Sequence, residues 1–133
     1  MIEWRTVDPL LLEPTFREDL IALLTPSQWT WYILHGYRSL EEQGKLWAIY
    51  QGGGPKAAPP GKSPHNFGLA VDLVPDADPA TPGLQPEWNI TAAAWTWLFG
   101  AVKAHPRLHS GLSFQDADHL ERLGWQRFTG WKA

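Results

Sequence analysis

No cysteine occurs among the 133 residues of this chain. Its absence excludes disulfide cross-links, thiolate nucleophiles and every zinc site that is built on cysteine. Any metal ion in this protein must therefore be held by histidine and carboxylate side chains. The chain has 5 histidines and 14 acidic residues from which such a site could be made.

Charge is also scarce, and no part of the chain concentrates one sign of it. Charged residues make up 19% of the sequence, with 11 Lys and Arg against 14 Asp and Glu, for a net charge of -3. There is no cluster of basic residues of the kind that contacts the phosphates of nucleic acids. We therefore expect no nucleic-acid partner.

Long hydrophobic runs are missing as well. The longest apolar stretches, residues 29–34 and 92–102, are too short to cross a bilayer. Glu3, Arg5 and Asp8 stand near the start, where a signal peptide would have a basic and then an apolar region. The sequence predicts a monomer that is made in the cytoplasm and does not insert into a membrane.

What the chain does contain is enough apolar and aromatic material for one packed domain, expected over residues 1–133. Hydrophobic residues make up 44% of the sequence, and 9 of them are tryptophans. Because tryptophan buries a large apolar surface, we expect a dense aromatic core that includes Trp47, Trp95 and Trp97.

Apolar spacing and turn residues outline the secondary structure. Helical periodicity predicts helices at residues 15–24, 39–50 and 87–105. Runs rich in aromatic and β-branched residues predict strands at residues 29–34, 69–74, 108–114, 119–122 and 125–128. Because helices and strands are mixed without a regular βαβ alternation, we expect an α+β fold with a central antiparallel sheet flanked by helices. The Gly- and Pro-rich segment 51–62 is expected to be a functional or mobile loop.

One segment with chemical potential runs from Ser63 to Asp72. His65 lies in a turn, Gly68 relaxes the backbone, and Asp72 follows in a strand among Leu, Ala and Val. An aspartate in such surroundings is costly to bury without a partner. A cation shared with His65 would offset that cost, whereas a capping aspartate paired with an arginine or a backbone amide is the purely structural alternative.

A second segment runs from Asp116 to Glu121. His119 and Glu121 fall on one face if this segment is extended, and Asp116 precedes His119 by three residues. Catalytic zinc sites often combine two histidines with a carboxylate, and a further carboxylate outside the metal shell takes a proton from water. Asp116 is placed for that second role, and Asp118 is its rival.

A third segment, Gly36 to Ser39, connects a predicted strand to a predicted helix. Arg38 lies at the start of that helix, an end that attracts anions rather than cations. Its guanidinium could polarise a scissile carbonyl or hold a substrate carboxylate. An arginine in an ordinary surface ion pair is the structural alternative.

Together the three segments resemble the zinc peptidases of the D-alanyl-D-alanine carboxypeptidase family, which includes phage L-alanyl-D-glutamate endolysins. The family pattern is Gly-Tyr-Arg-Ser and a helix with a Gln, then Ser-x-His-x-x-Gly-x-Ala-x-Asp, then Asp/Glu-x-x-His. These motifs match residues 36–39 with Gln43, residues 63–72 and residues 116–119. The resemblance implies a small α+β domain with a central antiparallel sheet, a fold shared with lysostaphin-type peptidases and the hedgehog signalling domain.

The resemblance also implies a role for each matching residue. The implied zinc ligands are His65, Asp72 and His119. Asp116 is implied as the general base, and Arg38 as the cation that polarises the carbonyl. The residues expected beside the substrate are Ser63, Gln43, Tyr37 and also His35, which stands where family members commonly carry Ser or Thr.

The activity implied by the resemblance is zinc-dependent hydrolysis of a peptide bond in the stem peptide of bacterial peptidoglycan. A short chain without a signal peptide suits a phage-type endolysin that reaches the cell wall after release through a holin and cuts the L-alanyl-D-glutamate bond. Two alternatives stay open. One is a D,D-carboxypeptidase that removes the terminal D-alanine, and the other is a non-catalytic, zinc-containing module that binds the cell wall.

Overall fold

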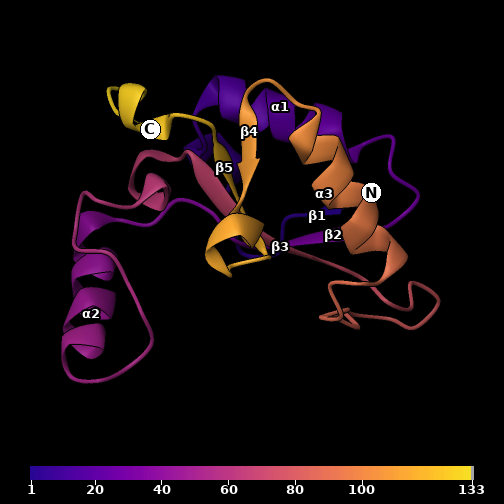
Figure 1. Ribbon diagram of the computed structural model, residues 1–133, viewed down its shortest axis with the longest axis horizontal. Helices are drawn as coiled ribbons and strands as arrows, with labels where there is room; N and C mark the ends of the chain where they lie inside the picture. The colour runs from indigo at the N-terminus through magenta and orange to yellow at the C-terminus, as the bar shows by residue number, and fades with distance from the viewer. Residues whose placement is uncertain (133) are drawn as a thin grey trace.

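A computed structural model of the chain describes residues 1–132. Within them, three α-helices accompany a five-stranded sheet with the strand order β1-β2-β3-β5-β4 (Figure 1). The helices are α1 (Pro14–Leu24), α2 (Leu40–Gln51) and α3 (Ala93–Lys103). The strands are β1 (Ile2–Glu3), β2 (Trp31–His35), β3 (Ala70–Pro75), β4 (Leu108–Ser110) and β5 (His119–Arg122). Short 3-10 helices are η1 (Pro9–Leu11), η2 (Pro64–Phe67), η3 (Gly111–Phe114) and η4 (Trp125–Arg127).

The α+β class predicted from the sequence is confirmed, with one refinement in the sheet. The pairs β2–β3, β3–β5 and β4–β5 are antiparallel, whereas β1 pairs with β2 in parallel. The connection from β1 to β2 contains α1, and a crossover of that length is what a parallel neighbour requires. The sheet is therefore mixed rather than wholly antiparallel.

One face of the sheet forms the core with α1 and α3. The strand register pairs Ile33 with Leu73 and Val71 with Leu120, so these residues point to the same face. They share one buried cluster with residues of the two helices, among them Phe16, Leu20, Trp95 and Leu98. Asp72 alternates with its apolar neighbours on β3 and therefore faces the opposite side.

The helix α2 stands away from this core. It projects from the sheet together with the loop that follows it (Figure 1). Its Gln43 is buried, while Leu40 and Ile49 are more than half exposed. Trp95 is fully buried as predicted and Trp97 packs against the core, but the prediction for Trp47 is wrong because that residue lies half-buried on α2.

Two of the expected elements are shorter than their apolar patterns. The helix expected at 87–105 begins only at Ala93, because the Asn89 side chain accepts a hydrogen bond from the Thr91 amide and holds the preceding residues in a turn. The strand expected at 108–114 ends at Ser110, whose hydroxyl accepts a hydrogen bond from the Leu112 amide and caps η3.

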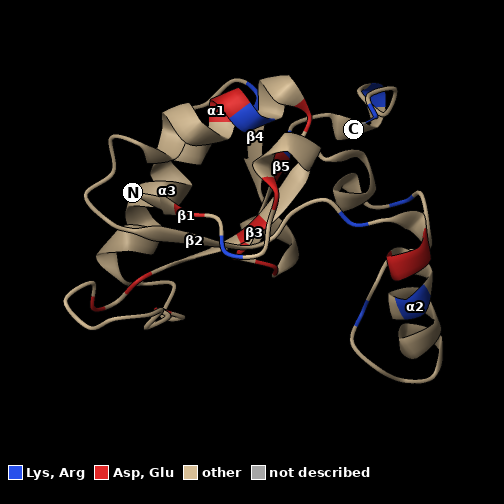
Figure 2. Cartoon of the chain, turned by 180° about the vertical axis from the view of Figure 1, so that it is seen from behind, with Lys and Arg blue, Asp and Glu red and all other residues tan. Residues whose placement is uncertain are grey.

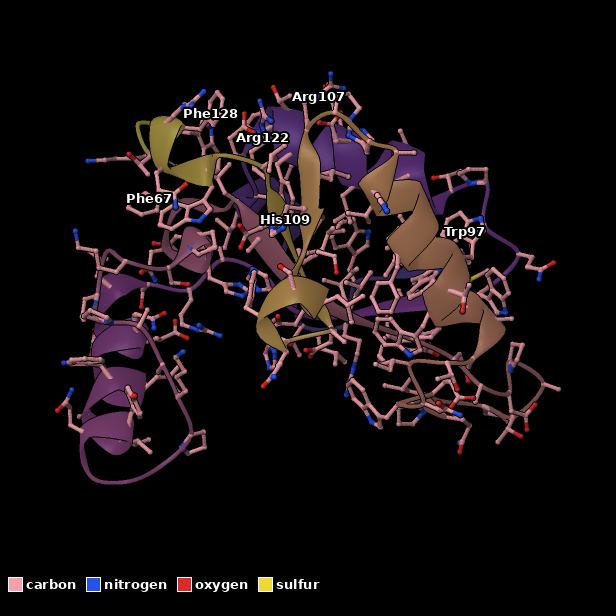
Figure 3. All side chains as sticks on the ribbon, viewed as in Figure 1. Phe67, Trp97, Arg107, His109, Arg122 and Phe128 are labelled. Carbon is pink, nitrogen blue, oxygen red and sulfur yellow. The ribbon has the colours of Figure 1, made fainter. Side chains whose placement is uncertain are left out.

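The strand expected at 125–128 is wrong, because this segment forms η4 after a turn at Gly124 with φ of +67°. The tail packs on the part of the chain that carries His65. Phe67 and Trp125 stack with ring centroids 6.1 Å apart, and the Arg122 guanidinium lies 4.2 Å from the Phe128 ring centre (Figure 3). The tail thus supports η2 from outside the sheet.

None of the helices within residues 1–132 has both the length and the apolar character of a membrane span. Lys and Arg are scattered over separate segments of these residues (Figure 2).

Asp19 on α1 links this helix to the start of β4. Two hydrogen bonds of 2.8 Å, donated by Nε and Nη2 of Arg107, reach its carboxylate. They lower the pKa of Asp19 from its ordinary value of 3.8 and outweigh the opposing effect of burial. A carboxyl with a depressed folded-state pKa stabilises the fold above its unfolded-state pKa, and this stabilisation is lost as the pH falls through the folded-state pKa.

We therefore expect Asp19→Asn to lower the melting temperature at neutral pH by about 3–6 °C. Thermal melts at a series of pH values should show the difference from the parent protein shrinking once the pH drops below 3.8. Glu18→Gln, on the exposed side of the same helix, is the matched control and should change little. A difference for Asp19→Asn that is equal at acidic and neutral pH would contradict the assigned ion pair.

Candidate active site

The sheet face opposite the core carries side chains from three neighbouring strands. Asp72 on β3 is directly opposite His119 on β5 and His35 on β2. Residues that are opposite each other in antiparallel strands point to the same side of the sheet. In Figure 2 the acidic positions of β3 and β5 lie close together along the two neighbouring strands.

His65 reaches the same place from η2, which precedes β3. The Ser63 hydroxyl caps η2 by accepting a hydrogen bond from the His65 amide, and Gly68 ends it with φ of +67°. The ring is buried, and Nδ1 lies 2.8 Å from the Gly36 carbonyl oxygen. Because a carbonyl can only accept, Nδ1 is the donor, and Nε2 is left with its lone pair 3.6 Å from Oδ1 of Asp72.

His119 is oriented in the same manner by Glu121, two residues further along β5. Its Nε2 lies 2.7 Å from Oε1 of Glu121, and its Nδ1 lies 3.5 Å from Oδ1 of Asp72. A carboxylate only accepts, so Nε2 donates to Glu121 and Nδ1 faces Asp72. The sequence pattern placed Glu121 on the face of His119 but assigned it no role.

These three residues fit a single metal ion. The donor atoms of His65, Asp72 and His119 all lie within 4.8 Å of one another. The two measured separations, 3.5 and 3.6 Å, approach the roughly 3.3 Å between ligands of a tetrahedral zinc ion. Each histidine also gives its other ring nitrogen to an acceptor, which is the usual arrangement of a metal-ligating histidine.

The electrostatics of the cluster favour a cation. Burial opposes ionisation of Asp72, but the neighbouring rings of His119, His35 and His65 outweigh it and hold the pKa of Asp72 well below its ordinary range. Burial likewise opposes a charge on His119, but hydrogen bonds with Asp72 and Glu121 raise its pKa to about 9. Binding of a metal ion must therefore displace a proton from His119.

Asp116 lies beside this cluster but outside it. Its Oδ2 is 4.0 Å from Nδ1 of His119, and its side chain is 51% exposed. The turn that carries Asp116 packs closely against Gly111 at the start of η3. A Cβ added at Gly111 would collide with the Asp116 carbonyl oxygen and come within 2.9 Å of the His119 Cβ. Only glycine allows this approach, which brings Asp116 to the metal-facing side.

Asp118, the rival base, lies half-buried next to Asp116. Burial raises the pKa of Asp118 to about 7, helped by a hydrogen bond with Asp116 and by the negative charges of Asp72 and Asp116. Its backbone carbonyl accepts a hydrogen bond from the Leu73 amide, so the residue is tied to β3. Of the two aspartates, Asp116 is the one that lines the cavity in front of the cluster.

That cavity has a volume of about 490 Å³ and separates the sheet from α2 and its loop. The three clustered residues and Asp116 lie on the sheet side. The other side consists of Arg38, Gln43, Leu46, Ile49, Ser63 and the loop segment 55–58 with Lys56. The loop predicted to be functional thus forms a wall of the site, although its Gly- and Pro-rich sequence gave no reason to single out Lys56.

Gln43 is the junction between Arg38 and this loop. Its Oε1 accepts hydrogen bonds from Nη1 of Arg38 at 3.1 Å and from Nδ2 of Asn66 at 3.3 Å. Its Nε2 donates to the Ala58 carbonyl at 2.7 Å, and the residue is only 1% exposed. Gln43 thus links Arg38 and the loop while lining the cavity, and its expected place beside the substrate stays a prediction. Sequence reasoning missed Asn66.

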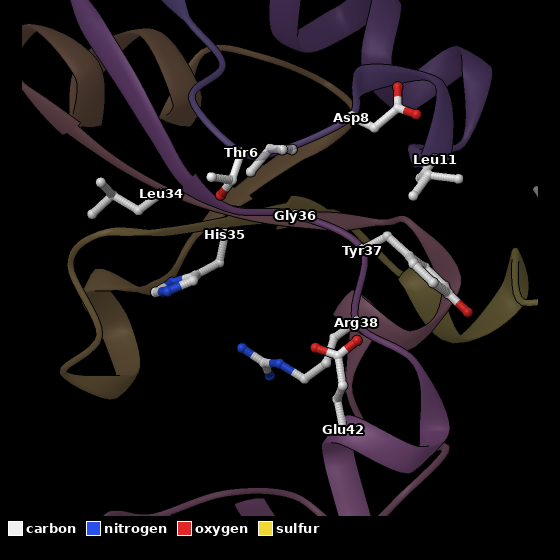
Figure 4. A pocket seen from close by; sticks show the side chains of 10 residues that line it. Thr6, Asp8, Leu11, Leu34, His35, Gly36, Tyr37, Arg38 and Glu42 are labelled. Carbon is white, nitrogen blue, oxygen red and sulfur yellow. The ribbon is translucent and has the colours of Figure 1, made fainter.

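The remaining residues expected beside the substrate lie in different places. Ser63 caps η2 and lines the cavity wall. Tyr37 points away from the side to which His35 and Arg38 extend (Figure 4) and lines two neighbouring hollows. His35 donates through Nδ1 to Oδ2 of Asp72 at 3.0 Å. A direct role for Ser63, Tyr37 or His35 in substrate binding stays a prediction.

We expect Gln43→Met to lower kcat about tenfold, because the Arg38 guanidinium loses the acceptor that orients it. The metal content should not change, since the hydrogen bonds of Gln43 go to Arg38, Ala58 and Asn66 rather than to the three clustered residues. Gln43→Glu keeps an acceptor for Arg38 and should recover part of the loss. Steady-state kinetics with metal analysis of each variant tests this, and a change confined to KM would contradict a positioning role.

With this geometry in place, the chain can be compared with known proteins. The sequence model of VanY, D-alanyl-D-alanine carboxypeptidase, matches residues 15–106, which is more than half of the chain. The chain belongs to the VanY family. The matched part includes Arg38, His65 and Asp72, whereas Asp116 and His119 lie beyond it. Membership in the VanY family, a family of peptidoglycan peptidases, confirms the resemblance drawn from the motifs.

Solved structures share the fold of this VanY-family chain. The Serratia marcescens L-Ala D-Glu endopeptidase ChiX has a TM-score of 0.63 and 19% sequence identity, over 92% of this chain and 87% of its own. The vancomycin resistance D,D-dipeptidase VanXYg, solved with a D-Ala-D-Ala phosphinate analogue, has a TM-score of 0.55 and 16% identity. That likeness covers 91% of this chain but only 56% of VanXYg. None of the curated proteins that were compared matches the chain.

Proposed function

We propose that this VanY-family protein is a zinc-dependent endopeptidase that cleaves the L-alanyl-D-glutamate bond of the peptidoglycan stem peptide, as a phage-type endolysin does. One observation carries the proposal. His65, Asp72 and His119 meet within 4.8 Å of one another in a cavity that Asp116 and Arg38 also line. A metal-binding triad, a carboxylate outside it and a cation around one cavity are the groups that metal-assisted peptide hydrolysis requires.

The proposed roles follow from where each side chain lies. Zinc, when held by the triad, supplies a Lewis acid that polarises a carbonyl and eases ionisation of water. Asp116 accepts the proton of the attacking water and returns it to the leaving amine. Arg38, held by Gln43, presents its guanidinium to the negative charge that develops on the carbonyl oxygen.

The shape around Arg38 favours cleavage inside a peptide over removal of its last residue. Arg38 lines the catalytic cavity and also a second hollow of about 270 Å³, which His35, Gly36, Tyr37 and Glu42 help to form (Figure 4). The substrate peptide can therefore be held on both sides of Arg38, as an endopeptidase requires. The cations Arg38 and Lys56 on the cavity wall suit a stem peptide, which carries carboxylates.

The bond that is cut can be read from the products. Purified peptidoglycan digested with the zinc-loaded protein should release stem peptides that begin with D-glutamate, identified by mass spectrometry. The Asp116→Asn protein serves as the matched control for spontaneous or contaminating hydrolysis. Free D-alanine as the only new product would refute the endopeptidase specificity, although the protein would still be a peptidase.

The D,D-carboxypeptidase is the second candidate, and the name of the matching family, D-alanyl-D-alanine carboxypeptidase, favours it. Such an enzyme must recognise the free terminal carboxylate, for which Lys56 is the available cation beside Arg38. A stem pentapeptide that begins with L-Ala-D-Glu and ends in D-Ala-D-Ala separates the two activities. The carboxypeptidase releases D-alanine and leaves the N-terminal L-alanine in place, whereas the endopeptidase releases L-alanine and leaves a tetrapeptide that begins with D-glutamate. Zinc binding without any hydrolysis would instead support the non-catalytic cell-wall module.

A further inference from the structure

We propose that His35 is a positioning residue of the metal site, whose ring holds Asp72 so that one carboxylate oxygen stays directed at the metal ion. The inference rests on the proposed metal site and deepens it. His35 itself does not belong to the triad, and its position carries Ser or Thr in the family pattern that the sequence resembles.

The strand register shows that His35 is brought to Asp72 by an irregularity. β2 and β3 pair regularly up to Ile33 opposite Leu73, and there the register shifts so that His35 lies opposite Asp72. Without this shift, the next residue, Leu34, would lie opposite Asp72, and His35 would point to the core side of the sheet. A bulge of this kind redirects a side chain, and bulges are common beside active sites.

The two oxygens of Asp72 have separate partners as a result. Oδ2 accepts a hydrogen bond from Nδ1 of His35 at 3.0 Å. Oδ1 is the oxygen that lies 3.6 Å from His65 and 3.5 Å from His119. With Oδ2 engaged, the carboxylate cannot rotate freely, and a single oxygen is presented to the metal ion. This places His35 in the role of the acceptors and donors that orient metal ligands from outside the coordination shell.

Exposure distinguishes His35 from a residue that serves the fold. Its side chain is 62% exposed, while that of Asp72 is 13% exposed. An exposed ring adds little to the core, so its removal should leave the folded state intact. The carboxylate that it orients is mostly shielded from water, where a hydrogen bond to a charged group has its full effect.

The test measures zinc affinity by competition between the metal-stripped protein and a chromophoric chelator, so that it does not depend on hydrolysis. We expect His35→Ala to weaken zinc binding about 10–100-fold, which is the usual effect of losing a partner of a metal ligand. In His35→Asn the amide nitrogen takes the place of Nδ1 and should restore most of the affinity. In His35→Gln the amide nitrogen falls near the place of Nε2 instead and should not.

The design separates failure of this inference from failure of the metal site. His65→Ala, which removes a triad member, should lose zinc in any case, and if it binds zinc as the parent does, the metal site itself is refuted. If His65→Ala loses zinc while His35→Ala binds it like the parent, only the role of His35 is refuted. Equal affinities of His35→Asn and His35→Gln would also refute it, since both variants keep a side-chain amide and only one can reach Asp72 from the Nδ1 position. Thermal melts of the metal-free His35 variants are expected to coincide with that of the parent, because the His35 ring is exposed.

Discussion

Asp116→Asn is expected to lower kcat/KM on peptidoglycan by at least about 100-fold while zinc stays bound. The asparagine amide has the size of the carboxylate but cannot take a proton from water. Asp116 lies at the edge of the cavity with Oδ2 4.0 Å from Nδ1 of His119, so it is close to the triad without belonging to it. Release of dye from labelled peptidoglycan, combined with metal analysis of the same sample, measures both parts of the prediction.

Asp118→Asn is the variant that tests which aspartate is the base. Asp118 lies one residue from His119 and two from Asp116, but Asp116 is the one that lines the cavity. We expect a smaller loss for Asp118→Asn than for Asp116→Asn. The reverse order would assign the base to Asp118. Loss of zinc from Asp116→Asn would show instead that Asp116 is a metal ligand.

Removal of the metal is expected to have the largest effect of all. Stripping the protein with a chelator, or replacing His119 with alanine, should reduce hydrolysis by more than about 10³-fold, because the Lewis acid contributes several kcal/mol of transition-state stabilisation. Activity of the stripped parent should return when zinc is added back. The His119→Ala protein should not recover, since the triad has lost one of its three donors.

A thermal melt gives a second readout of the same site that does not depend on activity. An ion that binds the folded state alone raises the melting temperature with its concentration. Zinc should therefore stabilise the metal-stripped parent and leave His119→Ala unchanged. Stabilisation by zinc in a parent that hydrolyses nothing would identify the binding module, and absence of any zinc effect on the parent would refute the metal site.

Local sequence rules accounted for the pieces of the site that lie within one element. Asp72 was expected in a strand among apolar neighbours, and alternation along β3 turns it away from Val71 and Leu73, as the register shows. The turn at Gly68 follows from the need for a residue that tolerates positive φ. These features depend on neighbours in the chain, which is why the sequence alone could predict them.

Features that depend on distant partners were harder to predict. Trp47 of α2 was expected in the core, yet only Gln43 of that helix is buried. That burial depends on contacts with Arg38, Asn66 and Ala58, which lie up to 23 residues away.

The absence of cysteine left histidine and carboxylates as the only ligands for a metal ion, and the resemblance of the motifs to a peptidase family implied two histidines and one aspartate. The tertiary structure decided their arrangement. Only the pairing of β3 with β5 sets Asp72 opposite His119, and only the register shift in β2 turns His35 toward Asp72. Strand pairing joins residues that are far apart in the sequence, and its register is set by the packing of the whole sheet rather than by any one segment.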